Sequence, residues 1–94
     1  MSTTVVRYTT KPERADENAG LIEKVMAELA ETRPEGLSYK VFRLEDGTFL
    51  HVADHADPNP LFASPAFQEF TREIADRVQA PPVAQPATLV GSYS

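Results

Sequence analysis

An Asp-Gly pair between two strand-like runs is the feature that most restricts how this chain can fold. The runs are Leu37–Leu44 (LSYKVFRL) and Thr48–His55 (TFLHVADH), and both are rich in β-branched and aromatic residues. Asp46-Gly47 lies between them, and Asp-Gly flanked by such runs is the strongest short hairpin signal. We expect a two-residue turn at this pair. In that register Leu44 pairs with Phe49, Phe42 with His51, and Tyr39 with Asp54.

The predicted register leaves apolar side chains on both faces of the hairpin. A sheet with helices on one face and water on the other is polar on its free face. This hairpin therefore needs two covers, and we expect helices to supply one and the sheet of a second subunit to supply the other. The sequence accordingly predicts a homodimer. The apolar residues are Phe42, Leu44 and Phe49 on one face and Val41, Leu50 and Val52 on the other.

The segment before the hairpin predicts a strand followed by a helix. Thr3–Thr10 (TTVVRYTT) has the composition of a strand. Pro12 suits the first turn of a helix, which we expect to run to about Thr32 because Pro34 follows. Apolar side chains recur along this helix at the spacing of a single face, namely Ile22, Val25, Met26 and Leu29.

The segment after the hairpin predicts a second helix and a fourth strand. Ser64 can cap the helix, with Pro65 at its first position. We expect Ala80–Pro86 to be extended and Ala87–Ser94 (ATLVGSYS) to form the fourth strand. The stripe of the second helix comprises Phe67, Phe70, Thr71, Ile74 and Val78.

The resulting order, β-α-β-β-α-β, is that of a ferredoxin-like α+β fold. Right-handed crossovers favour a four-stranded antiparallel sheet of order 4-1-3-2 with two helices on one face. The 94 residues suit a single domain that spans residues 1–94. A chain of this length buries a small core of its own, which is a second reason to expect a dimer.

Composition narrows the classes of function. The net charge of −5 argues against a nucleic-acid partner, because an acidic surface repels phosphates. The absence of cysteine excludes disulfides, thiolate metal sites and thiol nucleophiles. The first residues lack the features of a signal peptide, and no apolar run is long enough to cross a membrane. We therefore expect a cytoplasmic protein with neither a nucleic-acid nor a membrane partner.

Two segments carry a family resemblance together with this order of elements. One is the third strand, Phe49-Leu50-His51-Val52-Ala53-Asp54. The other is Pro60-Leu61-Phe62-Ala63-Ser64-Pro65-Ala66-Phe67-Gln68-Glu69-Phe70, which looks like a short turn followed by an S/T-P-x-F-x-x-F entry into the second helix. On these features the chain resembles the antibiotic biosynthesis monooxygenase (ABM) superfamily of dimeric α+β barrels. The resemblance implies a homodimer with an apolar pocket between helices and sheet in each subunit.

The resemblance implies more than one kind of activity. Some members oxidise aromatic polyketides or quinols with O2 and no cofactor, others degrade haem, and many have no known activity. This chain has no Trp, its first strand has no Asn, and Ala66 stands where relatives commonly have His. These departures argue against haem degradation, and we expect no cofactor.

His51 and Tyr39 are the candidate catalytic residues. Because imidazole titrates near neutrality, His51 can serve as a general base or a hydrogen-bond donor in a pocket, or it can be structural. Tyr39 can hold a phenol or quinone oxygen, or it can be an amphipathic interface residue. His55 lies four residues further along the strand, roughly 13 Å from His51, so the two cannot share one metal ion and no metal site is predicted.

Five further side chains are candidates for substrate binding. Four are apolar and can line an aromatic-binding cavity, although two helices need the same residue types to cover a sheet; they are Phe62, Phe67, Phe70 and Met26. The fifth is Arg43, which can bind a ligand carboxylate or pair with an acidic residue such as Asp54 or Glu45.

The sequence leaves two hypotheses for function. One is a cofactor-free oxygenase that acts on an aromatic or quinol-type substrate. The alternative is a non-catalytic dimeric α+β barrel that binds a small ligand or serves in a stress response. A cavity that contains His51 with hydrogen-bonding neighbours favours the enzyme, and a filled core favours the non-catalytic protein.

Overall fold

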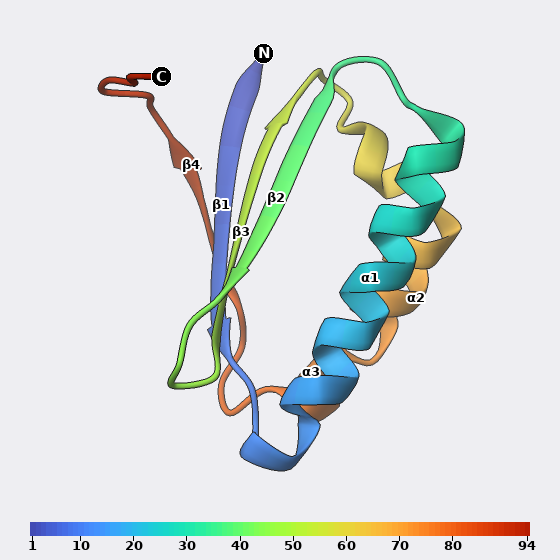
Figure 1. The fold of residues 1–94 in the computed structure, drawn as a ribbon, viewed down its shortest axis with the longest axis vertical. Helices are drawn as coiled ribbons and strands as arrows, with labels where there is room; N and C mark the ends of the chain where they lie inside the picture. The colour runs from blue at the N-terminus through green and yellow to red at the C-terminus, as the bar shows by residue number, and fades with distance from the viewer.

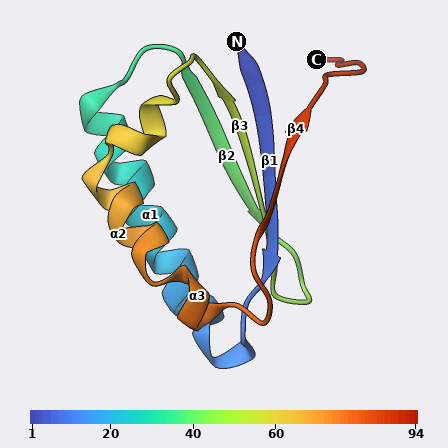
Figure 2. The ribbon, with the colours of Figure 1, turned by 180° about the vertical axis from the view of Figure 1, so that it is seen from behind.

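The sheet and its helices form two layers. The computed structural model describes residues 1–94. The elements, in chain order, are β1 (Ser2–Thr9), η1 (Pro12–Arg14), α1 (Ala15–Thr32), β2 (Leu37–Arg43), β3 (Thr48–His55), η2 (Pro60–Ala63), α2 (Pro65–Arg72), α3 (Ile74–Arg77) and β4 (Val83–Ala87). All the helices lie on one face of the sheet, as Figures 1 and 2 show from opposite sides. None of them is both long and apolar enough to cross a membrane.

The four strands are antiparallel and lie in the order β2-β3-β1-β4. This is the predicted order 4-1-3-2 counted from the opposite edge of the sheet. The predicted ferredoxin-like fold, with its helices on one face, is therefore confirmed.

The turn between β2 and β3 differs from the predicted turn by one residue. Its loop has three residues, Glu45-Asp46-Gly47, and the N–H of Leu44 donates to the carbonyl of Thr48 at 2.8 Å. Gly47 has φ of 87°, the left-handed conformation that closes three-residue hairpin loops. The carboxylate of Asp46 accepts from the N–H of Thr48 at 2.9 Å and holds the loop. The predicted two-residue turn is therefore wrong.

This shift exchanges the two faces of β2, because a slip of one residue turns every side chain over. Val41 pairs with His51 and Tyr39 with Ala53, so both β2 residues face the helices together with His51. The predicted pairing had placed Tyr39 on the opposite face from His51. The sheet still has two apolar faces, but their members differ from the prediction. The outer face, away from the helices, carries Val5, Phe42, Leu44, Leu50 and Val52.

The predicted stripe of α1 forms part of the core. Ile22 and Val25 are buried, and Met26 and Leu29 pack against the core cluster. The cluster joins both layers and consists of Tyr8, Ile22, Val25, Phe49, Ala53, Leu61, Phe70 and Val78. Hydrophobic burial between the helix layer and the sheet thus holds the two layers together.

The second helix begins as predicted but is shorter than predicted. Ser64 caps α2 by accepting from the N–H of Phe67 at 3.1 Å, and Pro65 occupies the first turn. Glu73, with φ of −119° and ψ of 20°, interrupts the helix and separates α2 from α3. Val78 lies beyond α3 and forms a β-bridge with Thr10, so this last member of the predicted stripe is not helical.

The fourth strand lies earlier in the chain than predicted. β4 is Val83–Ala87, inside the segment expected only to be extended, and residues 88–94 form no strand. β4 is an edge strand that pairs only with β1, and an edge strand tolerates a proline such as Pro86, which has no N–H to donate. The C-terminal tail, residues 88–94, leads away from the sheet in Figure 1. It exposes Leu89, Val90 and Tyr93.

Aspartate substitutions at Val41 and Phe42 test the corrected register. Val41 faces the helices, so a carboxylate there loses its hydration, and we expect Val41→Asp to lower the free energy of unfolding by about 3 kcal/mol. Phe42 is 50% exposed, so we expect Phe42→Asp to keep a wild-type far-ultraviolet circular dichroism spectrum. Urea unfolding of both variants measures the difference. A greater loss of folded structure at Phe42 than at Val41 would contradict the register.

Candidate functional site

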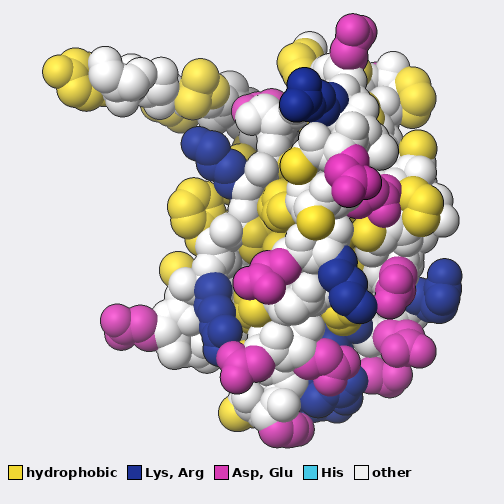
Figure 3. Space-filling view, turned by 45° about the vertical axis from the view of Figure 1, so that its right-hand side comes forward, with side chains coloured by type: hydrophobic (Ala, Val, Ile, Leu, Met, Phe, Trp, Pro, Cys, Tyr) yellow, Lys and Arg dark blue, Asp and Glu magenta, His cyan; other side chains and the backbone are white.

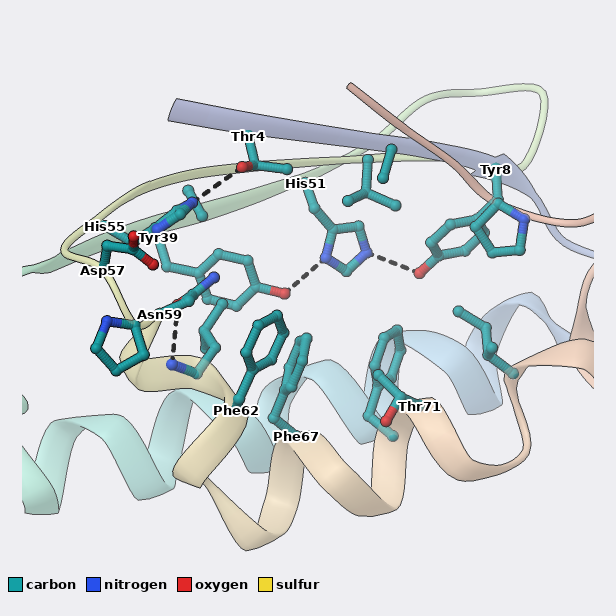
Figure 4. A pocket seen from close by; sticks show the side chains of 18 residues that line it. Thr4, Tyr8, Tyr39, His51, His55, Asp57, Asn59, Phe62, Phe67 and Thr71 are labelled. Atoms are coloured by element: carbon teal, nitrogen blue, oxygen red, sulfur yellow. Dashed lines mark hydrogen bonds between the residues drawn. The ribbon is translucent and has the colours of Figure 1, made fainter. Parts of the chain in front are cut away.

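A cavity lies between the inner face of the sheet and the helix layer. Its volume is about 440 Å³, and 10 of its 18 lining residues are hydrophobic. Small-molecule sites in proteins have volumes of ~300–1,000 Å³ and mostly apolar walls, so this cavity has the size and character of such a site. Phe62 and Phe67 line it from the helix side, as Figure 4 shows, and Phe70 extends the same wall. The ring of Phe67 lies 6.4 Å from that of Phe62 and 6.1 Å from that of Phe70.

His51 forms the polar centre of the cavity wall, between two tyrosines (Figure 4). Its Nε2 lies 2.8 Å from Tyr8 Oη, and its Nδ1 lies 2.6 Å from Tyr39 Oη. Each residue comes from a different strand, because β1 pairs with one side of β3 and β2 with the other. His51 is only 5% exposed, so both ring nitrogens depend on the tyrosines for hydrogen bonds.

Behind Tyr8 the hydrogen bonds continue into the helix layer. Asn18 of α1 is fully buried, and its Nδ2 donates to Tyr8 Oη at 2.9 Å. Arg77 of α3 is 1% exposed, and its Nε donates to Asn18 Oδ1 at 3.0 Å. Its Nη2 donates to the carbonyl of Phe70 at 2.7 Å, and the guanidinium lies over the Phe70 ring, 5.1 Å from the centroid. A continuous chain of hydrogen bonds therefore joins Arg77 to the cavity.

Burial sets the protonation states in this chain. It lowers the pKa of His51 from 6.5 to about 4, so the imidazole is neutral near pH 7. It raises the pKa of Tyr8 to about 12, against the opposing effects of the Asn18 hydrogen bond and the charge of Arg77. Burial, and then the neighbouring Tyr8, raise the pKa of Tyr39. Burial also lowers the pKa of Arg77, but a guanidinium remains charged at neutral pH.

These pKa shifts limit the chemistry that His51 can perform. A general base is most effective when its pKa lies near the working pH, and His51 is far below that. A neutral imidazole between two hydroxyl groups can instead pass a hydrogen bond from one to the other. Of the two functional roles expected for His51, the geometry fits hydrogen bonding better than proton abstraction.

A second polar group lies at the other end of the cavity, where β3 meets the following loop. His55 Nε2 lies 2.9 Å from Thr4 Oγ1, and His55 Nδ1 lies 3.0 Å from the carbonyl of Ala56. Asp57 and Asn59 line the same end (Figure 4). No group of three or more His, Asp or Glu side chains is arranged to hold a metal ion.

The structure brings five of the seven sequence-predicted site residues to this cavity. They are Tyr39, His51, Phe62, Phe67 and Phe70. Met26 lies outside it and lines a separate hollow of about 270 Å³ beside α1, which Tyr39 also borders. Arg43 lies outside both; it forms an ion pair with Asp16 at 3.0 Å and sits 5.8 Å from the centroid of Phe49. Met26 and Arg43 therefore do not contribute to the cavity, and Arg43 pairs with neither Asp54 nor Glu45.

The site residues chosen from the sequence do not include the three other members of the hydrogen-bond chain, namely Tyr8, Asn18 and Arg77. A signal for two of them was present. Asn18 precedes Ile22 by four residues, and Arg77 follows Ile74 by three, so each polar residue falls on an apolar helical stripe. A polar side chain on such a stripe faces the core and needs a buried partner. The partner itself depends on how the helices lie over the sheet, which the stripe does not define.

Solved structures with the same fold extend over nearly the whole chain. A crystal structure of an antibiotic biosynthesis monooxygenase matches with a TM-score of 0.75 and 18% identity, over 97% of this chain and 100% of the other. A protein from Caulobacter crescentus, provisionally described as an antibiotic biosynthesis monooxygenase, matches with a TM-score of 0.76 and 17% identity, over 96% and 90%. A protein of unknown function from Nitrosomonas europaea matches with a TM-score of 0.74 and 13% identity, over 99% and 92%.

Sequence comparison adds nothing to this likeness, because no family model and no curated protein matches the chain. At identities of 13–18%, the structural likeness establishes a shared fold. The resemblance to the ABM superfamily is thus confirmed at the level of architecture: the chain has the ferredoxin-like fold of solved antibiotic biosynthesis monooxygenases.

The protonation of His51 should make stability depend on pH. The pKa of a histidine in the unfolded chain is 6.5, whereas the pKa of His51 in the folded protein is about 4. As the pH falls below 6.5, the unfolded chain therefore binds a proton that the folded protein does not, and the unfolded state is favoured. We expect the free energy of unfolding to fall by about 2 kcal/mol between pH 7 and pH 5. Urea unfolding at a single protein concentration measures this loss. His51→Gln should abolish it and His55→Gln should not; an undiminished loss in His51→Gln would contradict this origin.

Proposed function

We propose that the cavity binds a small aromatic molecule and that the protein is a cofactor-free oxygenase acting on it. The observation that carries this proposal is His51, held between two tyrosine hydroxyls in the wall of an otherwise mostly apolar cavity. Apolar walls bind an aromatic ring, and a few placed polar groups orient it. The shared fold with a structure described as an antibiotic biosynthesis monooxygenase supports the oxygenase class.

A quinol illustrates a reaction that needs no added reductant. One oxygen atom of O2 is inserted into a ring C–H bond and becomes a hydroxyl group, while the two phenolic groups are oxidised to carbonyls. The second oxygen atom leaves as water with the two phenolic hydrogens. The four electrons that O2 accepts all come from the quinol, so the product is a hydroxyquinone.

The residues of the cavity would favour this reaction by stabilising charge on the ring oxygen. A phenolate is richer in electrons than a phenol and reacts more readily with O2. A hydrogen bond from the Tyr39 hydroxyl to that oxygen would stabilise the phenolate, and hydrogen bonds are stronger in an apolar site than in water. Phe67 and Phe70 would hold the ring and exclude water from it.

Oxygen consumption with a panel of quinols and polyphenols tests the proposal. We expect at least one compound to be oxidised faster than in buffer, and we expect Tyr39→Phe to reduce kcat about 100-fold by removing one hydroxyl group. Tyr93→Phe is the matched control, because Tyr93 lies in the exposed tail and is 100% exposed. A rate equal to that of buffer for every compound would count decisively against an oxygenase.

Calorimetric titration with the same compounds separates the oxygenase from the non-catalytic alternative. An oxygenase should both bind a compound and consume O2 with it. Binding that depends on Phe67 but is accompanied by no oxygen consumption would assign the cavity to a small-ligand-binding module.

We also propose that the protein is a homodimer joined through the outer face of the sheet. Phe42 and Leu44 on that face are 50% and 48% exposed, and no helix of the chain covers them. The helix side is different, because acidic and basic side chains are interspersed over it (Figure 3). A second copy of the sheet would bury the apolar outer face and extend a core that is small in one chain.

Light scattering at micromolar protein concentration tests the dimer. We expect the wild-type protein to have the mass of two chains and Phe42→Asp to have the mass of one, because a carboxylate on the buried face opposes association. Ala75→Asp, at an exposed position of α3, should leave the mass unchanged. A wild-type mass of one chain would refute the proposal.

A further inference from the structure

Each hydrogen bond in the chain behind His51 has a donor and an acceptor, and their order determines whether the cavity wall presents a donor or an acceptor. We infer that Arg77 sets this direction and leaves the Tyr39 hydroxyl as a hydrogen-bond donor towards the cavity. The ligand group at this end is then an acceptor oxygen, such as a quinone carbonyl or a phenolate. The inference rests on the proposed ligand-binding function and adds the chemical class of the ligand group that the site selects.

Arg77 can only donate, because a guanidinium has no acceptor atom. Its Nε lies 3.0 Å from the side-chain amide of Asn18, so the amide must present its oxygen to Arg77. The amide nitrogen then faces Tyr8 and donates to its Oη at 2.9 Å. A buried charge thus orients an amide that could otherwise be placed either way round.

Tyr8 can pass the hydrogen bond on in only one way. Its oxygen already accepts from Asn18, and its own hydrogen needs an acceptor because the residue is only 4% exposed. The acceptor within reach is His51 Nε2, at 2.8 Å. A proton on Nε2 would direct two donors at the Tyr8 oxygen and leave the tyrosine hydrogen buried without a partner, which is costly. Nε2 of His51 is therefore the acceptor.

A neutral imidazole with an unprotonated Nε2 carries its hydrogen on Nδ1. Burial keeps His51 neutral near pH 7, and Nδ1 lies 2.6 Å from Tyr39 Oη, so Nδ1–H donates to that oxygen. Tyr39 makes no other side-chain hydrogen bond within the chain, and it lines the cavity. Its hydrogen is left for a bound molecule, and an acceptor oxygen satisfies it. Arg77, Asn18 and Tyr8 are accordingly positioning residues for this donor.

A single near-isosteric substitution should reverse the chain. In Asn18→Asp both carboxylate oxygens accept, one from Arg77 and the other from the Tyr8 hydroxyl. The Tyr8 oxygen then accepts from Nε2–H of His51, and Tyr39 donates to Nδ1. Tyr39 would present lone pairs to the cavity in place of a hydrogen.

Nitrogen-15 NMR of the histidine side chains at about pH 8 tests the direction without any ligand. We expect His51 to be the Nδ1–H tautomer in the wild-type protein and the Nε2–H tautomer in Asn18→Asp. His51→Gln identifies the resonances, and the backbone amide spectrum confirms that each variant is folded. An Nε2–H tautomer in the wild-type protein would overturn the inference, as would an unchanged tautomer in folded Asn18→Asp.

Binding of 1,4-naphthoquinone and of 1-naphthol tests the ligand class, because the quinone only accepts hydrogen bonds whereas the naphthol also donates. We expect the wild-type protein to prefer the quinone, and we expect Asn18→Asp to shift the ratio of the two dissociation constants towards the naphthol about tenfold. An unchanged ratio with a reversed tautomer would overturn the ligand class. Failure of both compounds to bind, with the expected tautomers, would refute the proposed function and leave the direction of the chain standing.

Discussion

The buried guanidinium of Arg77 is the constraint on which the organisation of the site depends. It cannot lose its proton at neutral pH, and burying a charge is costly unless good acceptors surround it. Neither ion pair of the chain includes Arg77, so neutral groups must meet its charge. Those groups are the carbonyl and ring of Phe70 on α2 and the amide of Asn18 on α1. One charge on α3 thereby ties three helices together and orients the polar groups that lead to the sheet.

Polar and apolar groups have different effects in the cavity wall. The apolar residues exclude water, which removes charge from His51 and keeps both neighbouring tyrosines protonated. In such surroundings an unpaired polar group is costly and a paired one interacts strongly. Every buried side-chain nitrogen and oxygen has a hydrogen-bond partner. In the proposed reaction, the chemistry would come from placed hydrogen bonds acting on the electrons of a bound ring.

How much could be predicted from the sequence depended on how local each signal was. The α1 stripe with Ile22 and Val25 and the Ser64 cap are local, and the structure confirms them. The hairpin register was not defined by a local signal, because Gly47 suits both a two-residue and a three-residue loop. Part of what holds the observed loop is distant in sequence, since Thr10 donates its N–H to the Gly47 carbonyl at 3.1 Å. Similarly, aromatic residues could be chosen as candidates by type, whereas the partner of Arg77, Asn18, depends on how α3 lies against α1.

The edge strand β4 has a consequence for how binding and association relate. Ala84 of β4 and Pro82 just before it line the cavity, and the same segment continues into a tail that exposes Leu89 and Val90. A molecule that bound this tail and held β4 in place would also restrain one wall of the cavity. Ligand binding in the cavity and association at the tail would then be coupled. If association made the ligand bind more tightly by some factor, the ligand would strengthen association by the same factor. With a second copy of the chain at the tail, the fraction of cavities that hold ligand would depend on protein concentration.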